Sequence, residues 1–185
     1  MATKSFQFKV PSSEDIGKYI EKAKERILES VKEAYELSCM AAVNRAKMTD
    51  TYKDRTNNLR SSIGYVLYYN GEMVSEFFEA GGRGTGGGGE VSFTTSNGTE
   101  VSFTAAAKDS SGQEGVNTGR SLANMIALRH ATSGFVAIII AGMHYALYVE
   151  AMGYDVLTSS TLDITKDLQE YFDIINKEYG TRLRA

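Results

Sequence analysis

The chain has 185 residues, of which 42% are hydrophobic and 23% are charged, a composition typical of a folded domain. Its 20 basic and 23 acidic residues give a net charge of -3, which argues against a general affinity for nucleic acid or anionic membranes. The single cysteine, Cys39, excludes an internal disulfide framework and a cysteine-based zinc site. We expect one domain spanning residues 1–185, with no cofactor and no metal.

The first expected element is a long amphipathic helix. Ser12 or Ser13 can cap it, and apolar residues recur every three or four positions from Ile16 to Ala46. No proline or glycine interrupts residues 18–47, and a helix of about 30 residues is about 45 Å long. Because this length exceeds the width of a small domain, we expect part of the apolar stripe to need a partner.

A polar, linker-like segment over 48–58 precedes a β-hairpin. Alternating strands over 62–69 and 72–79 flank Asn70 and Gly71, the strongest short hairpin signal. The expected pairs are Tyr69–Glu72, Leu67–Val74 and Ile63–Phe78. The opposite face would hold Val66, Tyr68, Met73 and Phe77. Since both faces are apolar, the long helix can cover one, and the other needs a further element or a second subunit.

The next segment, 81–119, is interpreted as a β-hairpin arm inserted on glycine hinges. Residues 81–89 are glycine-rich and are expected to be a mobile tether. Residues 90–94 then recur as 100–104, and 105–119 are loop-like. A three-residue loop over 96–98 places four apolar residues on one side of this hairpin, where they form a candidate assembly surface. They are Val91, Phe93, Val101 and Phe103.

Four elements are expected after the arm: a helix over 121–131, a central β-branched strand over 135–140, a short helix over 144–152 and an edge strand over 155–157. A last helix begins near Ser160, which has capping-box spacing to Asp163, and ends at Gly180. This order predicts an α+β fold in which a long N-terminal helix and a C-terminal helix pack on a mainly antiparallel sheet, with the inserted β-hairpin arm.

Cofactor and membrane motifs are weak. Gly84-x-Gly86-x-x-Gly89 matches a dinucleotide-binding fingerprint in its letters, but a strand-like segment follows where the pyrophosphate would need a helix. The longest apolar run, 135–141, is far shorter than the roughly 20 residues that cross a bilayer. The first residues lack the apolar region of a secretory signal.

Two alternative functions remain open on the residues alone. Cys39 with His130 or His144 would suit a small hydrolase or transferase. A nucleic-acid-contacting structural subunit would use Arg182 and Arg184, the only local positive patch.

Two stretches of the chain resemble a known family. Residues 55–63 resemble the Thr-Gly-x-Leu-Arg-x-Ser-Ile signature of bacteriophage tail-completion (head–tail joining) proteins, and residues 144–153 resemble that family's Tyr-Ala-x-x-Val-Glu-x-Gly stretch. Asn57 stands where the family has Gly, and Asn tolerates a left-handed backbone better than most residues. Gly153 lies one residue further from Glu150 than usual. The matching positions are Thr56, Leu59, Arg60, Ser61, Ile63, Tyr145, Ala146, Val149, Glu150 and Gly153.

The resemblance implies a virion structural protein of the phage neck, without catalytic activity. Such a tail-completion (tail-terminator-like) or head–tail connector subunit would assemble in the host cytoplasm as a homo-oligomeric ring, a hexamer or a dodecamer. Its partners would be head-completion or portal proteins and the tail-tube protein. DNA would be contacted only if the subunit lines the ring lumen, and no membrane is involved.

Overall fold

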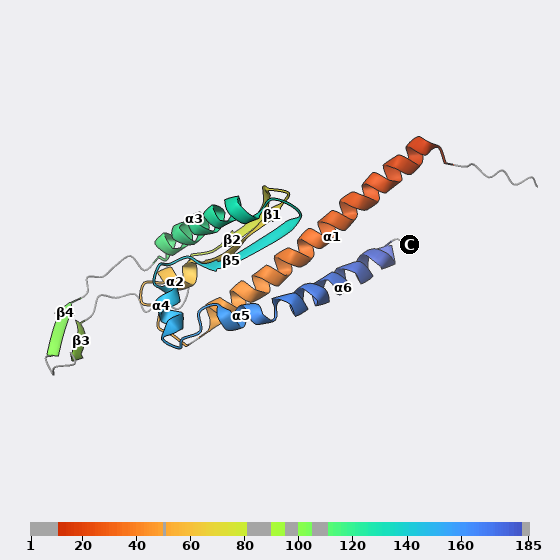
Figure 1. The fold of residues 1–185 in the computed structure, drawn as a ribbon. Coiled ribbons are helices and arrows are strands. Elements are labelled where there is room, and N and C mark those ends of the chain that lie inside the picture. Colours follow the sequence, from red (N-terminus) through yellow and green to blue (C-terminus); the bar gives the residue numbers. More distant parts are fainter. Residues whose placement is uncertain (1–10, 50, 81–89, 95–99, 105–110, 183–185) are drawn as a thin grey trace, which may run out of the picture.

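The computed structural model describes residues 11–49, 51–80, 90–94, 100–104 and 111–182. An antiparallel sheet of order β2-β1-β5 lies between α3 on one face and α1 on the other, and α6 packs along α1 (Figure 1). The expected α+β class is confirmed. The elements are α1 (Ser13–Met48), α2 (Asn58–Ser61), β1 (Ile63–Tyr69), β2 (Glu72–Phe78), β3 (Glu90–Thr94), β4 (Glu100–Thr104), α3 (Gln113–His130), β5 (Phe135–Ala141), α4 (Ala146–Ala151), α5 (Thr158–Leu162) and α6 (Ile164–Arg182).

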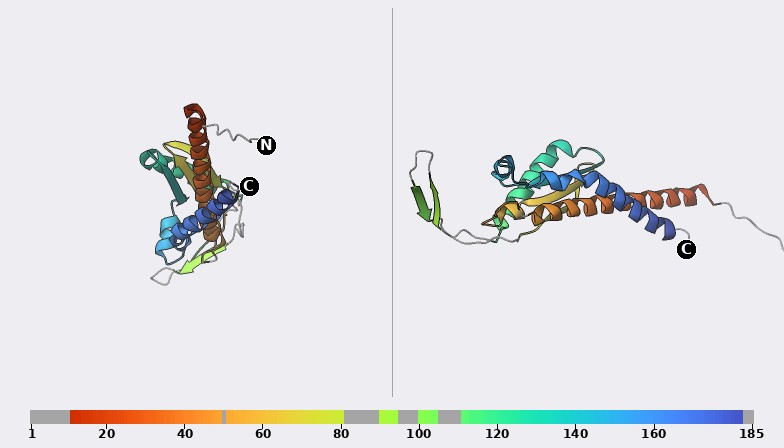
Figure 2. Two further views of the ribbon diagram at one scale, coloured as in Figure 1. Left: turned by 90° about the vertical axis from the view of Figure 1, so that its right-hand side faces the viewer. Right: turned by 90° about the horizontal axis from the view of Figure 1, so that it is seen from below.

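Helix α1 begins as the sequence predicts and is longer than the sheet. The Ser12 hydroxyl accepts from the Asp15 amide, and the Asp15 carboxylate accepts from the Ser12 amide, which completes a capping box. Cys39 and Val43 in the second half are fully buried against the sheet, whereas the first turns extend past it (Figure 2). That a partner covers these turns stays a prediction. Their exposed apolar residues are Ile16, Tyr19, Ile20 and Ile27.

The β1–β2 hairpin has the expected turn but a shifted register. Asn70 and Gly71 both have positive φ, and Tyr69 pairs with Glu72 as predicted. A β-bulge between Leu67 and Tyr68 then leaves Val74 as the extra residue on β2. The expected pairs Leu67–Val74 and Ile63–Phe78 are therefore wrong. Leu67 pairs with Ser75, Tyr65 with Phe77, and Gly64 with Phe78.

The bulge exchanges the faces of Phe77 and Phe78, because a slip of one residue turns every later side chain to the other side. Phe77 stacks on Tyr65 on the α1 side, with 6.3 Å between ring centroids. Phe78 packs beside Val66 on the α3 side. Gly64 makes this possible, since a Cβ there would overlap the Phe78 ring.

Helix α3 covers the second face of the sheet, so no second subunit is needed there. Ala123 and Ile126 pack on Val66 and Ile140. The expected loop over 113–119, the end of the 81–119 arm, and the helix start at 121 are wrong, because α3 already begins at Gln113. Glycine residues lower the helix propensity of this segment, which is why the sequence predicts a loop. In the structure they allow α3 to pack closely on its neighbours. A Cβ on Gly119 would lie 2.5 Å from the Ser62 carbonyl oxygen.

The chain after α3 departs from expectation in three places. β5 is an edge strand, because β1 takes the central position. Residues 155–157 form a loop rather than an edge strand, although Val156 in it is fully buried. The expected last helix is two helices that meet at Asp163, with Ser160 inside α5 and Gly180 inside α6 rather than at its end. The expected short helix over 144–152 is confirmed as α4.

An ion pair anchors this C-terminal unit to α1. Arg45 donates to the Asp167 carboxylate at 2.6 Å and to the Ser160 carbonyl at 3.0 Å. The same arginine therefore holds both α5 and α6 against the second half of α1.

Strands β3 and β4 form a separate two-stranded sheet. Val91 pairs with Phe103 and Phe93 with Val101, which is the register the sequence predicts. The glycine tether 81–89 and the loop 96–98 lie outside the described residues, as do 105–110.

Candidate functional site at the junction of the two motifs

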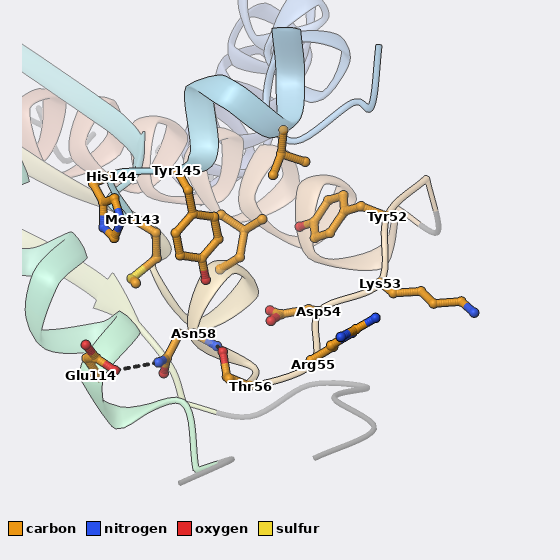
Figure 3. Close-up of a pocket in the computed structure, with 12 residues that line it drawn as sticks. Tyr52, Lys53, Asp54, Arg55, Thr56, Asn58, Glu114, Met143, His144 and Tyr145 are labelled. Carbon is orange, nitrogen blue, oxygen red and sulfur yellow. Dashed lines mark hydrogen bonds between the residues drawn. The ribbon is translucent and has the colours of Figure 1, made fainter. Parts of the chain in front are cut away.

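The fold brings the two family-like stretches together at the end of the sheet. Ser62, in the first stretch, accepts from the Gly142 amide through its carbonyl at 3.1 Å and from the Met143 amide through its hydroxyl at 3.2 Å, and these two residues immediately precede the second stretch. A pocket of about 380 Å³ lies beside this contact, and we call it the junction pocket (Figure 3). Its lining residues are Tyr52, Lys53, Asp54, Arg55, Thr56, Asn58, Leu59, Glu114, Met143, His144, Tyr145 and Val149.

Arg60, which follows the pocket residue Leu59, is buried, with only 4% of its surface exposed. Its guanidinium donates to the carbonyl of Lys47 and, at 3.4 Å, to that of Tyr52. The same group lies 4.9 Å from the centroid of the Tyr52 ring. One side chain therefore joins the end of α1, the loop after it and α2.

Asp54 fixes the start of α2. Its buried carboxylate accepts from the Arg60 amide at 2.7 Å, which satisfies an N–H in the first turn of that helix. Asn57 precedes the helix with a φ of 61°, so the asparagine adopts the left-handed conformation at the position where the signature it resembles has glycine.

The Tyr52 hydroxyl is buried and makes no hydrogen bond with any described residue. Burial raises the pKa of Tyr52 to about 12, and the Arg60 charge opposes that shift. In Figure 3 the hydroxyl points inward, toward Tyr145. Tyr145 has a raised pKa as well, because of its burial and the nearby Asp54 carboxylate, while a hydrogen bond with Thr56 acts in the opposite direction.

The far side of the pocket is closed by α3. The Asn58 side chain donates to the Glu114 carboxylate at 2.7 Å and accepts from the Gly115 amide at 3.3 Å (Figure 3). Lys53 and Arg55 point away from the pocket centre. The inward-facing polar groups thus mainly bond to one another, which is typical of a structural junction.

Glu150 acts away from the pocket, at the start of α5. Its carboxylate accepts from the Leu157 amide at 3.3 Å and from the Thr158 amide at 2.8 Å. Burial alone would raise the pKa of Glu150, but the hydrogen bonds from Thr158 and Leu157 outweigh it and the pKa is lowered. Gly153 ends this turn with a φ of 87°.

The ten motif residues therefore have separate structural positions. Thr56, Leu59, Tyr145 and Val149 line the pocket, and Arg60, Ser61, Ile63 and Ala146 are buried around it. Glu150 and Gly153 shape the α4–α5 turn instead. The arm residues Val91, Phe93, Val101 and Phe103 lie on β3 and β4, whose side chains are not described.

Sequence reasoning missed Tyr52 and Asp54, because they lie in the stretch expected to be a linker. Both are buried, while Thr51, Lys53 and Arg55 between and beside them are exposed. The available signal in the sequence was the alternation of Tyr52 and Asp54 with the basic residues Lys53 and Arg55.

The candidate catalytic residues do not meet. Cys39 is fully buried in α1, and burial raises the pKa of its thiol to about 12, which disfavours the reactive thiolate. His144 lines the junction pocket, and His130 is exposed at the end of α3. Among the described residues, no group of three or more His, Cys, Asp or Glu side chains could hold a metal ion.

Two other expectations, the absence of a membrane-spanning segment and the basic tail, concern residues that the structure describes only in part. No helix within the described residues is long and apolar enough to span a membrane. Of the basic tail, Arg182 is the last residue of α6, and Arg184 lies outside the described residues.

No protein-family model, curated protein or solved structure matches this chain.

Proposed function

We propose that this protein is a structural subunit of the phage neck, a tail-completion or head–tail connector protein that acts by assembling into a ring between the portal and the tail. The observation that carries the proposal is the junction itself. Two family-like stretches about 80 residues apart come together at the junction pocket, which Thr56 and Leu59 line from the first stretch and Tyr145 and Val149 from the second. Five of the motif residues are buried, namely Leu59, Arg60, Ser61, Ile63 and Ala146, which favours a structural role for these stretches.

The exposed surface favours assembly as well. Ile16, Tyr19, Ile20 and Ile27 form an apolar stripe on the first turns of α1, with exposures between 47% and 71%. A stripe of this kind on a helix that extends past its own sheet is typical of a protein-interaction surface. The α1 stripe thus adds a second contact region to the arm.

The test is assembly with the proposed partners. The purified full chain is studied by light scattering and negative-stain electron microscopy, alone and with portal, head-completion and tail-tube proteins from the genome that encodes it. We expect rings of the chain alone, or rings that form on the portal or on the end of the tail tube. A strict monomer that binds none of these proteins would contradict the proposal.

A matched variant makes the test specific. Ile20→Glu places a charge on the exposed α1 stripe, and Glu21→Gln changes an adjacent exposed residue that lies off the stripe. Both variants should fold like the parent, because neither position is buried. We expect Ile20→Glu alone to weaken ring formation. Genes for portal and capsid on one side and tail proteins on the other would support the proposal independently.

A further inference from the structure

The outer edge of β5 presents a row of backbone groups without a strand partner among the described residues. The sheet order β2-β1-β5 makes β5 an edge. Gly142 donates to Ser62 and Asn70 donates to Gly134, so the even-numbered residues of β5 bond to β1. The N–H and C=O groups of Phe135, Ala137 and Ile139 therefore point outward.

The two edges of this sheet differ in how they resist further pairing. The β2 edge carries Glu72 and Glu76 and is interrupted by the bulge at Val74. Charges and bulges of this kind discourage a further strand. β5 is a regular run of seven apolar residues, FVAIIIA, with no charge, proline or bulge. Only β5 therefore has the properties of a pairing edge.

An apolar groove of about 360 Å³ lies beside that edge. β5 contributes Phe135 and Ala137, α1 contributes Tyr35, and α6 contributes Ile164 and Leu168. Phe135 and Ala137 are residues whose backbone groups face outward. A strand added to β5 would thus find hydrogen-bond partners and an apolar surface for alternate side chains in the same place.

The β3–β4 hairpin fits this position. A two-stranded sheet of five-residue strands is marginal in water by itself and is stabilised by further strands and an apolar surface. Its register places Val91, Phe93, Val101 and Phe103 at alternate positions that share one face. Among the described residues it does not pair with the β2-β1-β5 sheet.

We propose that the β3–β4 hairpin of one copy adds to the outer edge of β5 in a second copy, with its apolar face over the groove formed by β5, α1 and α6. This contact joins two different surfaces, so each copy can give one hairpin and receive one. A series of such contacts from copy to copy closes into a ring when the rotation between neighbouring copies allows it. The inference rests on the ring assembly proposed above and names the surfaces that make it.

Two single-surface variants and a control test the contact in the full chain. Ala137→Pro removes an outward-facing N–H from the edge, a position where a strand tolerates proline, and Ala137→Ser keeps that N–H. The double variant Phe93→Asp, Phe103→Asp places charges on the apolar face of the hairpin. We expect the parent and Ala137→Ser to self-associate, and each of the other two to associate about tenfold or more weakly.

Mixing the two blocked variants is the decisive experiment. Ala137→Pro retains an intact hairpin, and the double Asp variant retains an intact β5 edge. Their mixture should therefore form a 1:1 complex that grows no further, as measured by light scattering. If the mixture stays monomeric, or if either variant assembles like the parent, the proposal is wrong. If the double Asp variant alone still pairs through β5, the occupant is a second β5 edge rather than the hairpin.

Hydrogen exchange of the parent protein gives a readout that needs no variant. On assembly, the amides of Phe135, Ala137 and Ile139 should become protected, while those of Val136 and Ile138 are protected already in the monomer. No change at the odd-numbered amides on assembly would overturn the proposal even if Ala137→Pro failed to fold. Self-association through β5 without binding to portal or tail proteins would reject the neck function and leave this contact standing.

Discussion

The guanidinium of Arg60 lies 4.9 Å from the ring centroid of Tyr52 and donates to that residue's carbonyl. It also donates to the Lys47 carbonyl, so the last turn of α1, the loop 51–57 and α2 share one buried cation. This arrangement gives the arginine of the first motif a structural task that requires its planar, multiple-donor head group.

Replacing this arginine should destabilise the whole junction. We expect Arg60→Ala to lower the free energy of unfolding by about 3 kcal/mol, because two carbonyls lose their donor and a buried side chain is removed. Arg60→Lys should recover only part of the lost free energy of unfolding, since a single ammonium group cannot reproduce the several N–H donors of the planar guanidinium. Urea denaturation measures both. Arg55→Ala, at an exposed neighbour, should stay within about 0.5 kcal/mol of the parent, and an equal loss there would contradict the assignment.

Two helical glycines should respond oppositely to alanine. Gly119→Ala places a methyl group 2.5 Å from the Ser62 carbonyl oxygen, so we expect about 2 kcal/mol of destabilisation. Gly17→Ala lies in α1 with no atom near the added methyl group, and should stabilise the protein by about 0.5–1 kcal/mol. Thermal unfolding distinguishes them. Similar shifts in both variants would mean that α3 does not pack closely on the end of β1.

We expect the buried Tyr52 hydroxyl to destabilise the folded protein rather than to stabilise it. Tyr52→Phe removes a desolvated hydroxyl while keeping the ring under Arg60, so we expect no change or a gain of up to about 1 kcal/mol. The matched change is Tyr68→Phe, which deletes a hydroxyl that donates to Asn124 at 2.9 Å. That variant should lose about 1 kcal/mol. A clear loss in Tyr52→Phe would indicate that the hydroxyl has a partner in solution.

The acid limb of the stability curve should report on Glu150. Its folded-state pKa is lowered from 4.5, so its stabilising effect is complete above that value and disappears as the pH falls through the folded pKa. Glu150→Gln should therefore cost about 1 kcal/mol near neutral pH and little once the carboxyl is protonated. Urea titrations at several pH values measure this difference. Glu170→Gln, at an exposed position on α6, is the control, and an equal loss of stability in it would contradict the assignment to Glu150.

Local signals predicted the elements better than their arrangement. The capping box at Ser12 and the Asn70-Gly71 turn were readable because each depends on neighbouring residues. The expected loop over 113–119 is wrong because Gly115 and Gly119 lower helix propensity locally, whereas in the fold they allow close approach, Gly115 to Asn58 in α2 and Gly119 to Ser62 just before β1. The junction pocket was found only in part, since Tyr52 and Asp54 belong to a polar segment whose burial depends on distant partners.

Sequence by itself determined the α+β class, the long α1, the pairing of β3 with β4 and the two motif stretches, because each is encoded by short-range periodicity or by repeated letters. Tertiary structure alone decided that β1 is central and β5 an edge, that a bulge turns Phe77 and Phe78 to opposite faces, and that the two motif stretches meet at the junction pocket. These outcomes depend on which surfaces pack against one another. Packing is a property of the whole chain, and no local window contains it.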